Sequence, residues 1–220
     1  IKIYKGPIFE PYRFAGLVSR KKTDRISSGI INTKNQSFLE KIMLWIRGNL
    51  FIPDARKFWV KPSVQFLSEV LQKEDVKTII TTGPPHSVHL IGYRLKQKFE
   101  LQWLADFRDP WTSIGYHKKL KLTKTSLRKH KSLERMVLNA ADRITVTSTT
   151  TKNEFSTITT KPIEVITNGY DVTPLNTGKL DAKFTISHIG SLLTGRNPKN
   201  LWQVLSELIS ENLDFKNAVQ

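Results

Sequence analysis

The sequence predicts an α/β protein built on a mainly parallel sheet. From about residue 76 onward, short apolar runs rich in β-branched residues alternate with amphipathic stretches. Alternation at this spacing favours parallel strands that are joined by right-handed crossovers, with helices on both faces of a doubly wound, Rossmann-like sheet. The expected elements are strand 76–81, helix 86–99, strand 101–107, helix 125–141, strand 143–147, helix 150–158 and strand 163–167.

The residues ahead of this repeating part predict less regular structure. Residues 1–14 mix β-branched and aromatic side chains with two prolines, which is typical of a short strand that runs into a loop. Residues 19–36 are expected to form an exposed connection. Residues 37–49 have apolar side chains at helical spacing behind a capping Ser37, and a second helix should end near Lys73.

The domain organisation follows from the distribution of turn formers. We expect a first domain over residues 1–171 and a linker over residues 172–183, which contain little periodic hydrophobicity. Residues 184–220 should begin a second α/β unit, with a strand over residues 184–190 and a helix over about residues 200–210. The chain begins with neither a signal peptide nor a methionine, so we expect it to be part of a longer protein.

The chain is strongly basic and contains no cysteine. It has 35 lysines and arginines against 19 acidic residues, a formal net charge of +16, which favours anionic partners. Without cysteine it has neither disulfides nor a thiolate zinc site, which is compatible with a reducing cytoplasm. The five histidines lack metal-ligand spacing, so we expect no metal or other cofactor. Neither a P-loop nor a GxSxG motif is present, so hydrolases of those types are disfavoured.

A run of positive charge lies between Asp109 and Glu134, where no acidic residue occurs. Such a run forms a solvated face, a patch for an anionic membrane, or a nucleic-acid surface. Nucleic acid is the least favoured of the three because aromatic side chains that could stack on bases are sparse there. The basic residues singled out for a membrane patch are Lys118, Lys119, Lys121, Lys124 and Arg128.

Polar residues and turn formers follow three of the expected strands, which is where open α/β sheets bind ligands. After the first strand, Gly83 and Pro84 lead into His86 and Ser87, at the start of a helix whose free N–H groups suit an anion. The alternative is that His86 or Ser87 simply caps that helix.

The next junction carries three ionisable residues within four positions. Asp106, Arg108 and Asp109 follow an apolar strand and precede Trp111. Because buried charges need partners, one interpretation is an arginine–carboxylate pair that fixes the loop. The other is functional: a carboxylate orients or deprotonates a hydroxyl group while Arg108 binds an anionic group.

The last junctions give weaker signals. Asn168 and Gly169 after an apolar strand predict a tight turn. In the second unit, Arg196 follows a flexible loop between the predicted strand and helix, where it could contact a diphosphate.

Four segments together resemble the bacterial family 4 glycosyltransferases of GT-B fold, which act on surface polysaccharides. Residues 105–111 (ADFRDPW) resemble a strand-end motif of that family, with Arg108 at a position that is more often histidine. Residues 141–148 (ADRITVTS), 166–171 (ITNGYD) and 188–196 (HIGSLLTGR) resemble its aDxvxxxS strand, its pNGvD turn and the opening of its donor domain. The resemblance covers about residues 75–210.

The resemblance implies a truncated GT-B protein: an incomplete acceptor domain followed by the start of a nucleotide-sugar domain. The implied reaction is metal-independent, retaining transfer of a sugar from a nucleotide-sugar to a hydroxyl group of a saccharide or lipid-linked acceptor. It would take place in the cytoplasm or at the inner face of the membrane. The implied site residues are Asp106, Arg108 and Asp109 for catalysis, Gly83, His86, Ser87 and Trp111 for the acceptor, Gly190, Ser191 and Arg196 for the donor diphosphate, and Asn168 and Gly169 between the domains.

Two departures from the family set further expectations. Ser191 stands where the family usually has an arginine, and the Glu-x7-Glu motif of the donor domain is missing from the chain. The 220-residue chain alone is therefore expected not to transfer sugar. The rival hypothesis is a non-catalytic basic module that binds anionic membrane or polysaccharide, and an uncovered sheet edge also favours self-association.

Overall fold

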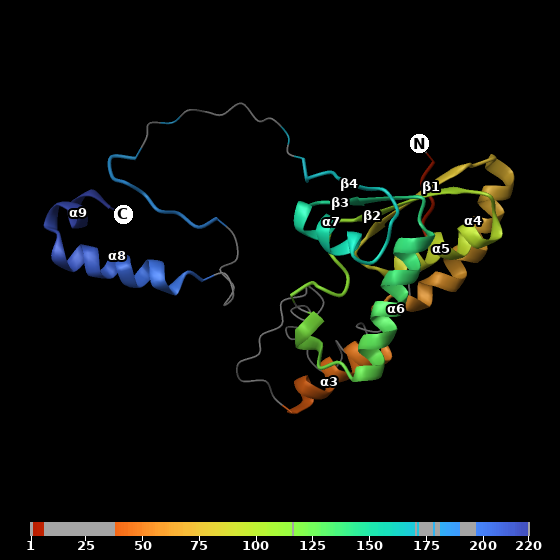
Figure 1. The fold of residues 1–220 in the computed structure, drawn as a ribbon, viewed down its shortest axis with the longest axis horizontal. Coiled ribbons are helices and arrows are strands. Elements are labelled where there is room, and N and C mark those ends of the chain that lie inside the picture. The colour runs from red at the N-terminus through yellow and green to blue at the C-terminus, as the bar shows by residue number, and fades with distance from the viewer. Residues whose placement is uncertain are drawn as a thin grey trace. The chain divides into compact units, whose positions relative to one another are not determined.

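The computed structural model describes residues 2–6, 38–115, 117–169, 171, 178, 181–189 and 197–219. The chain divides into two compact units, residues 1–169 and residues 170–220. The sheet and the helices that pack on it belong to the first unit (Figure 1). Of the expectations for the first 37 residues, the described residues 2–6 form no strand, and the other positions, including Ser37, lie outside the described residues.

The first unit contains a four-stranded parallel sheet in the order β1–β2–β3–β4. The strands are β1 (Thr78–Gly83), β2 (Gln102–Phe107), β3 (Arg143–Val146) and β4 (Ile163–Val165). Each strand of the repeating part was predicted from its apolar run to within about two residues at each end. The predicted parallel α/β class is confirmed.

Helices connect and flank these strands. The connecting helices are α5 (Ser87–Lys98), α6 (Lys124–Ala140) and α7 (Thr149–Ser156). Ahead of the sheet come α3 (Phe38–Leu50), the short 3₁₀ helix η1 (Lys57–Trp59) and α4 (Val60–Glu74), and a second 3₁₀ helix, η2 (His117–Leu120), precedes α6. Thr123 caps α6 by accepting a hydrogen bond from the Ser126 backbone N–H at 3.1 Å.

Burial alternates along the middle and end of β1 and along β2. On β2, Trp103 and Phe107 are at most 1% exposed, whereas Asp106, which points to the opposite face, remains partly exposed. On β1, Ile80 is 68% exposed although it lies in the middle of the strand. Because successive side chains of a strand point to opposite faces, one face of this sheet is covered and the other is open.

The strand order explains why the helices lie on one face. The chain steps from β1 to β4 in one direction across the sheet, and right-handed crossovers that step in one direction place their helices on the same side. A doubly wound sheet reverses this direction at one point, which brings helices to the second face. The described strands contain no such reversal, so the expectation of helices on both faces is not met among them.

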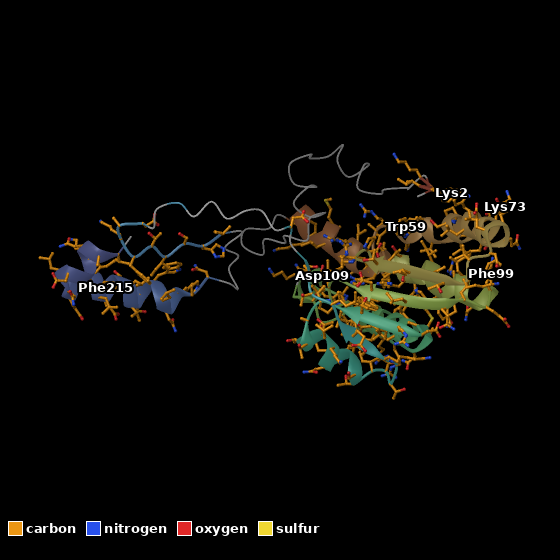
Figure 2. All side chains as sticks on the ribbon, turned by 90° about the horizontal axis from the view of Figure 1, so that it is seen from above. Lys2, Trp59, Lys73, Phe99, Asp109 and Phe215 are labelled. Atoms are coloured by element: carbon orange, nitrogen blue, oxygen red, sulfur yellow. The ribbon has the colours of Figure 1, made fainter. Side chains whose placement is uncertain are left out.

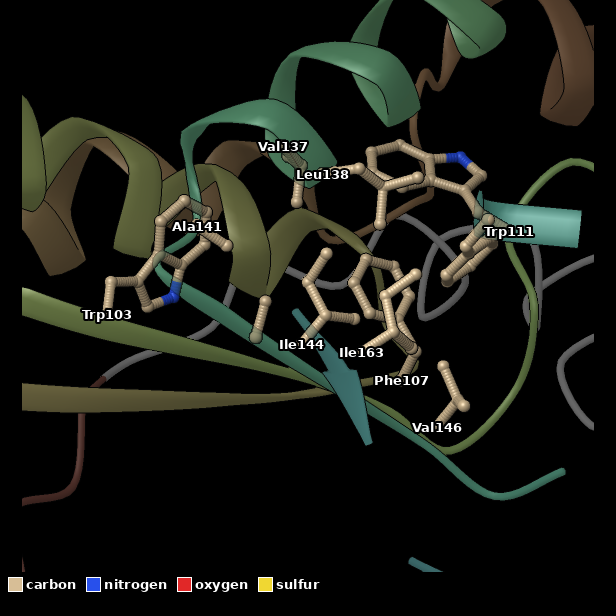
Figure 3. Close-up of a cluster of buried hydrophobic side chains, with 11 residues drawn as sticks. Trp103, Phe107, Trp111, Val137, Leu138, Ala141, Ile144, Val146 and Ile163 are labelled. Carbon is tan, nitrogen blue, oxygen red and sulfur yellow. The ribbon is translucent and has the colours of Figure 1, made fainter. Parts of the chain in front are cut away.

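The main core lies between the sheet and these helices (Figure 3). Phe107 of β2 meets Phe155 of α7 edge to face, with ring centroids 5.0 Å apart. Trp103 packs under α5, where a Cβ built on Gly92 would lie only 2.6 Å from the indole ring. Only glycine at position 92 allows α5 to approach β2 this closely. A second cluster, which includes Val64 of α4, fixes α4 on α5.

The second unit contains α8 (Lys199–Glu211) and α9 (Leu213–Ala218). The predicted helix over about residues 200–210 is confirmed as α8, whereas α9 was not predicted. The predicted strand over residues 184–190 is wrong for the described residues 184–189, which make only a single bridge between Phe184 and Val219. A strand needs a neighbouring strand to pair with, and the described part of this unit provides none.

Candidate functional site

Asp106 lies near the carboxyl end of β2, on the open face of the sheet. The strand register places it between Thr82 of β1 and Thr145 of β3. The Thr82 hydroxyl donates to Oδ2 of Asp106 at 2.5 Å, and the Thr145 hydroxyl donates to Oδ1 at 2.7 Å. Both carboxylate oxygens are therefore held, and Asp106 links three neighbouring strands.

Arg108 is fixed by its backbone and keeps its guanidinium at the surface. Its N–H donates to the Gly83 carbonyl and its own carbonyl accepts from the Thr147 hydroxyl, each at 2.9 Å. Its Nη2 donates to the Pro84 carbonyl at 2.9 Å. The arginine–carboxylate pair considered from the sequence is not seen, because Arg108 forms no salt bridge within the described part of the chain.

Asp109 differs from both neighbours because its carboxylate is exposed and unengaged. Within the described ranges it takes part in no hydrogen bond or ion pair. It lies at the carboxyl end of the sheet, whereas Phe99, ahead of β2, lies at the opposite end (Figure 2). An ionised carboxylate has about four lone-pair sites for donors, and those of Asp109 face solvent.

The loop that carries Asp109 is anchored by buried groups on α6. Trp111 is 1% exposed and its indole N–H donates to Nδ1 of His130 at 3.4 Å. Glu134 accepts from the backbone N–H of Thr112 at 2.9 Å and from its hydroxyl at 2.6 Å. Burial raises the pKa of Glu134 above its ordinary value, although the bonds to Thr112 act against this shift. The loop is thus held by side chains of α6, while the Asp109 carboxylate remains exposed and unbonded within the described part of the chain.

The junction after β1 is buried and internally satisfied. Ser87 is inaccessible to solvent, and Asp54 accepts from its backbone N–H at 2.7 Å and from its hydroxyl at 2.9 Å. The Trp59 indole N–H donates to the same hydroxyl at 2.9 Å. Burial raises the pKa of Asp54, and the bonds from Ser87 oppose this shift. The helix start that the sequence offered to an external anion is therefore occupied by the protein's own carboxylate.

This arrangement also replaces the capping role considered for His86 and Ser87. His86 occupies the N-cap position of α5 but makes no side-chain cap hydrogen bond. Its ring is 5% exposed and stacks on Trp111, with ring centroids 4.9 Å apart. Gly83 is also buried, and a Cβ at that position would lie 2.7 Å from the His89 ring. The residues predicted to bind the acceptor are thus buried and have a structural role beneath the site: Gly83, His86, Ser87 and Trp111.

Four histidines are buried in and around these supporting residues: His86, His89, His117 and His130. Burial lowers the pKa of His86 to about 3, with smaller contributions from His117 and His130. Burial lowers the pKa of His130 to about 4, and it lowers the pKa values of His89 and His117 as well. Each of the four rings has a buried nitrogen without a hydrogen-bond partner among the described residues. Neutral imidazoles are consistent with this packing.

The segment over residues 141–148 serves structural roles. Asp142 accepts from the Trp103 backbone N–H at 2.7 Å and forms a salt bridge with Lys96, which ties α5 to the start of β2. Ser148 caps α7 by accepting from the Thr151 N–H at 3.2 Å. Within this segment, two threonines reach the candidate site: Thr145 donates to Asp106, and Thr147 donates to the Arg108 carbonyl.

The structure describes only some of the other residues predicted from the sequence. Asn168 and Gly169 are exposed, and their backbone forms no defined turn. Gly190, Ser191 and Arg196 lie outside the described residues, as does the Lys118 side chain. The remaining members of the basic run are exposed: Lys119, Lys121, Lys124 and Arg128.

Four residues that contact or support the site were not predicted from the sequence: Thr82, Thr145, Asp54 and Glu134. The position of Thr145 could have been inferred once the strand register was known, because it lies directly opposite Asp106. No local signal identifies Asp54, which is 33 positions from Ser87 in the chain.

The described residues were also considered as metal ligands and as membrane-spanning helices, and they form neither. Within the described ranges, no group of three or more histidine, cysteine or acidic side chains is arranged to hold a metal ion. None of the helices in the described part of the chain has the length and apolar character needed to cross a bilayer.

Comparison of the chain with protein-family models, curated proteins and solved structures finds no match.

Proposed function

We propose that the chain provides the acceptor side of a glycosyltransferase that moves a sugar from a nucleotide-sugar to a hydroxyl group of a saccharide or lipid-linked acceptor. The observation that carries this is the exposed Asp109 carboxylate, which follows the bonded residues Asp106 and Arg108 at the carboxyl edge of a parallel sheet. This edge is where open α/β sheets bind ligands. The motif resemblance over residues 105–111 adds the reaction class.

The three residues suit different roles because their engagement differs. Asp109 has free acceptor sites and lies in a loop anchored at Arg108 and Thr112, so it suits the orientation or deprotonation of a hydroxyl group. Asp106 already accepts two threonine hydroxyls, so it suits a positioning role. Arg108 uses one guanidinium N–H on the Pro84 carbonyl, and its remaining donors suit an anionic group of the substrate.

The transfer test uses the full-length protein that carries this chain, with uridine and guanosine diphosphate sugars as donors. Asp109→Asn and Arg108→Ala are each expected to reduce turnover by about 10²-fold or more, the range in which a positioned acid–base group contributes. Circular dichroism checks that both variants are folded. Asp75→Asn is the matched control, because it makes the same change at an exposed position that follows α4.

The possible outcomes test the role of Asp109 and the assignment as a glycosyltransferase separately. If the parent transfers sugar and Asp109→Asn transfers equally well, Asp109 is not the reactive carboxylate. If the folded parent consumes no donor, the non-catalytic basic module becomes the better account. The 220-residue chain alone is expected to be inactive, and transfer by it would contradict that expectation.

A further inference from the structure

One face of α3 exposes large apolar side chains. Phe38, Ile42 and Trp45 follow one another at intervals of four and three residues, so they lie along a single stripe of the helix. Their exposed fractions are 79%, 39% and 42%. An exposed stripe with two aromatic side chains is unusual for a surface helix and marks an interaction site.

A different face of α3 is docked, so the stripe has a fixed orientation. Leu44 packs against Leu120 and Leu122. A Cβ at Gly48 would lie 2.6 Å from the Leu120 carbonyl oxygen, so only glycine allows this close approach. The helix α3 is therefore docked through Leu44 and Gly48, and the stripe remains exposed on a helix that is held in place.

The docked end of α3 is joined to the basic run. The Asn49 side chain donates to the Lys121 carbonyl at 3.2 Å and accepts from the Thr123 N–H at 2.8 Å. These bonds hold Lys121 and the first turn of α6, which begins at Lys124, beside the end of α3. Lys57 also reaches this end, where its ammonium donates to the Leu50 carbonyl at 2.5 Å.

The outer face of α6 extends the positive charge. Lys124, Arg128, Lys131 and Arg135 repeat at helical spacing, and all four are exposed. None of them forms a salt bridge within the described part of the chain. Their charged groups are therefore not held in ion pairs with acidic side chains of the described residues.

We infer that α3 and the adjoining basic residues bind an anionic lipid surface, with Phe38, Ile42 and Trp45 entering the headgroup region and the lysines contacting lipid phosphates. Helices that lie in a membrane interface combine aromatic and aliphatic side chains with lysine and arginine, and tryptophan favours that depth. A protein partner fits less well, because lysine is depleted at protein–protein interfaces. The surface uses no residue of the candidate site, so it stands whether or not the chain transfers sugar.

Vesicle co-sedimentation of the 220-residue chain tests this inference. The chain is expected to bind phosphatidylcholine vesicles that contain phosphatidylglycerol and not vesicles of phosphatidylcholine alone. Because binding strength follows both buried apolar area and charge, the double variant Phe38→Ser, Trp45→Ser should bind about tenfold more weakly or worse. Lys121→Glu with Lys124→Glu should lose binding similarly, and higher salt should weaken binding by the wild type.

A matched pair of charge reversals controls for net charge. Lys73→Glu with Lys98→Glu changes the total charge by the same amount at exposed positions on α4 and α5, and it should leave binding nearly unchanged. The tryptophan emission of the wild type should also shift to shorter wavelength on anionic vesicles, and Trp45→Phe should remove most of that shift. Circular dichroism verifies that each variant is folded.

Three results would overturn the inference. The first is no binding of the wild type to anionic vesicles. The second is an equal loss of binding in the control pair, which would indicate attraction by net charge alone. The third is full binding by the Phe38→Ser, Trp45→Ser variant together with equal affinity for a soluble anionic polysaccharide, which would identify a polyanion surface in place of a lipid surface.

Discussion

The junctions that follow β1 and β2 have similar sequence character but opposite environments. At the first, Ser87 is buried and its donors are bound by Asp54. At the second, Asp109 is exposed and has no bond within the described part of the chain. The difference indicates that polar residues after a strand mark a site only where their bonding capacity is left open. The first junction supports the fold, and the second is available to a ligand.

Removal of the Asp54 carboxylate should give the largest effect on stability. In Asp54→Ala the buried N–H and hydroxyl of Ser87 lose their acceptor, which is expected to lower the free energy of unfolding by about 2–4 kcal/mol. Asp54→Asn keeps one acceptor oxygen and should cost less. Urea denaturation measures both. If Asp54→Ala costs under about 0.5 kcal/mol, the first junction is not a structural support.

Acidification should weaken the same junction through its histidines. Burial holds the pKa values of His86 and His130 at about 3 and about 4, below the ordinary 6.5, so the unfolded chain binds more protons as the pH falls. Their stabilising contribution is complete above pH 6.5 and is lost toward pH 4 and below. Each histidine adds a slope of about 1.4 kcal/mol per pH unit in that range.

Two carboxyl groups, one half-buried and one buried, act in the opposite direction. Burial raises the pKa values of Asp54 and Glu134, so their protonation at low pH favours the folded chain. Because four histidines have lowered pKa values, we expect a net fall in the urea midpoint between about pH 7 and pH 5. His130→Gln should reduce that slope, whereas the exposed His188→Gln should not. An unchanged slope in His130→Gln would refute this account.

The second junction should respond least in stability. Asp109→Asn changes an exposed, unbonded group and is expected to shift the free energy of unfolding by less than about 0.5 kcal/mol. Thr145→Val removes the 2.7 Å bond to Asp106 and should cost about 1.5 kcal/mol or more, since the partner is a carboxylate. Urea denaturation of the two variants side by side measures the contrast. A larger loss for Asp109→Asn than for Thr145→Val would contradict the geometry of the site.

Local patterns in the sequence were sufficient for most elements of the first unit. The apolar runs of β1 to β4 and the amphipathic stretches of α5 to α7 depend on neighbouring residues alone, so their positions could be predicted. The absence of a strand at residues 184–189 could not be predicted in this way. An apolar run becomes a strand only where another strand pairs with it.

The covered face of the sheet depended on strand order. Alternation of strands and helices predicts parallel crossovers but does not say whether the chain reverses direction across the sheet. In the described strands it does not reverse, so Ile80 and Asp106 lie on an open face. The partial exposure of Asp106 follows from this order and was not predictable from its own sequence context.

The sequence by itself determined the α/β class, the strand positions and the acidic and basic residues at the end of β2, because these depend on composition and local periodicity. Only the tertiary structure decided which of the two polar junctions is satisfied. The bond between Asp54 and Ser87 joins residues 33 positions apart, and the contact of Asp106 with Thr145 depends on the register of two strands. Long-range contacts of this kind arise from packing, and no local pattern encodes them.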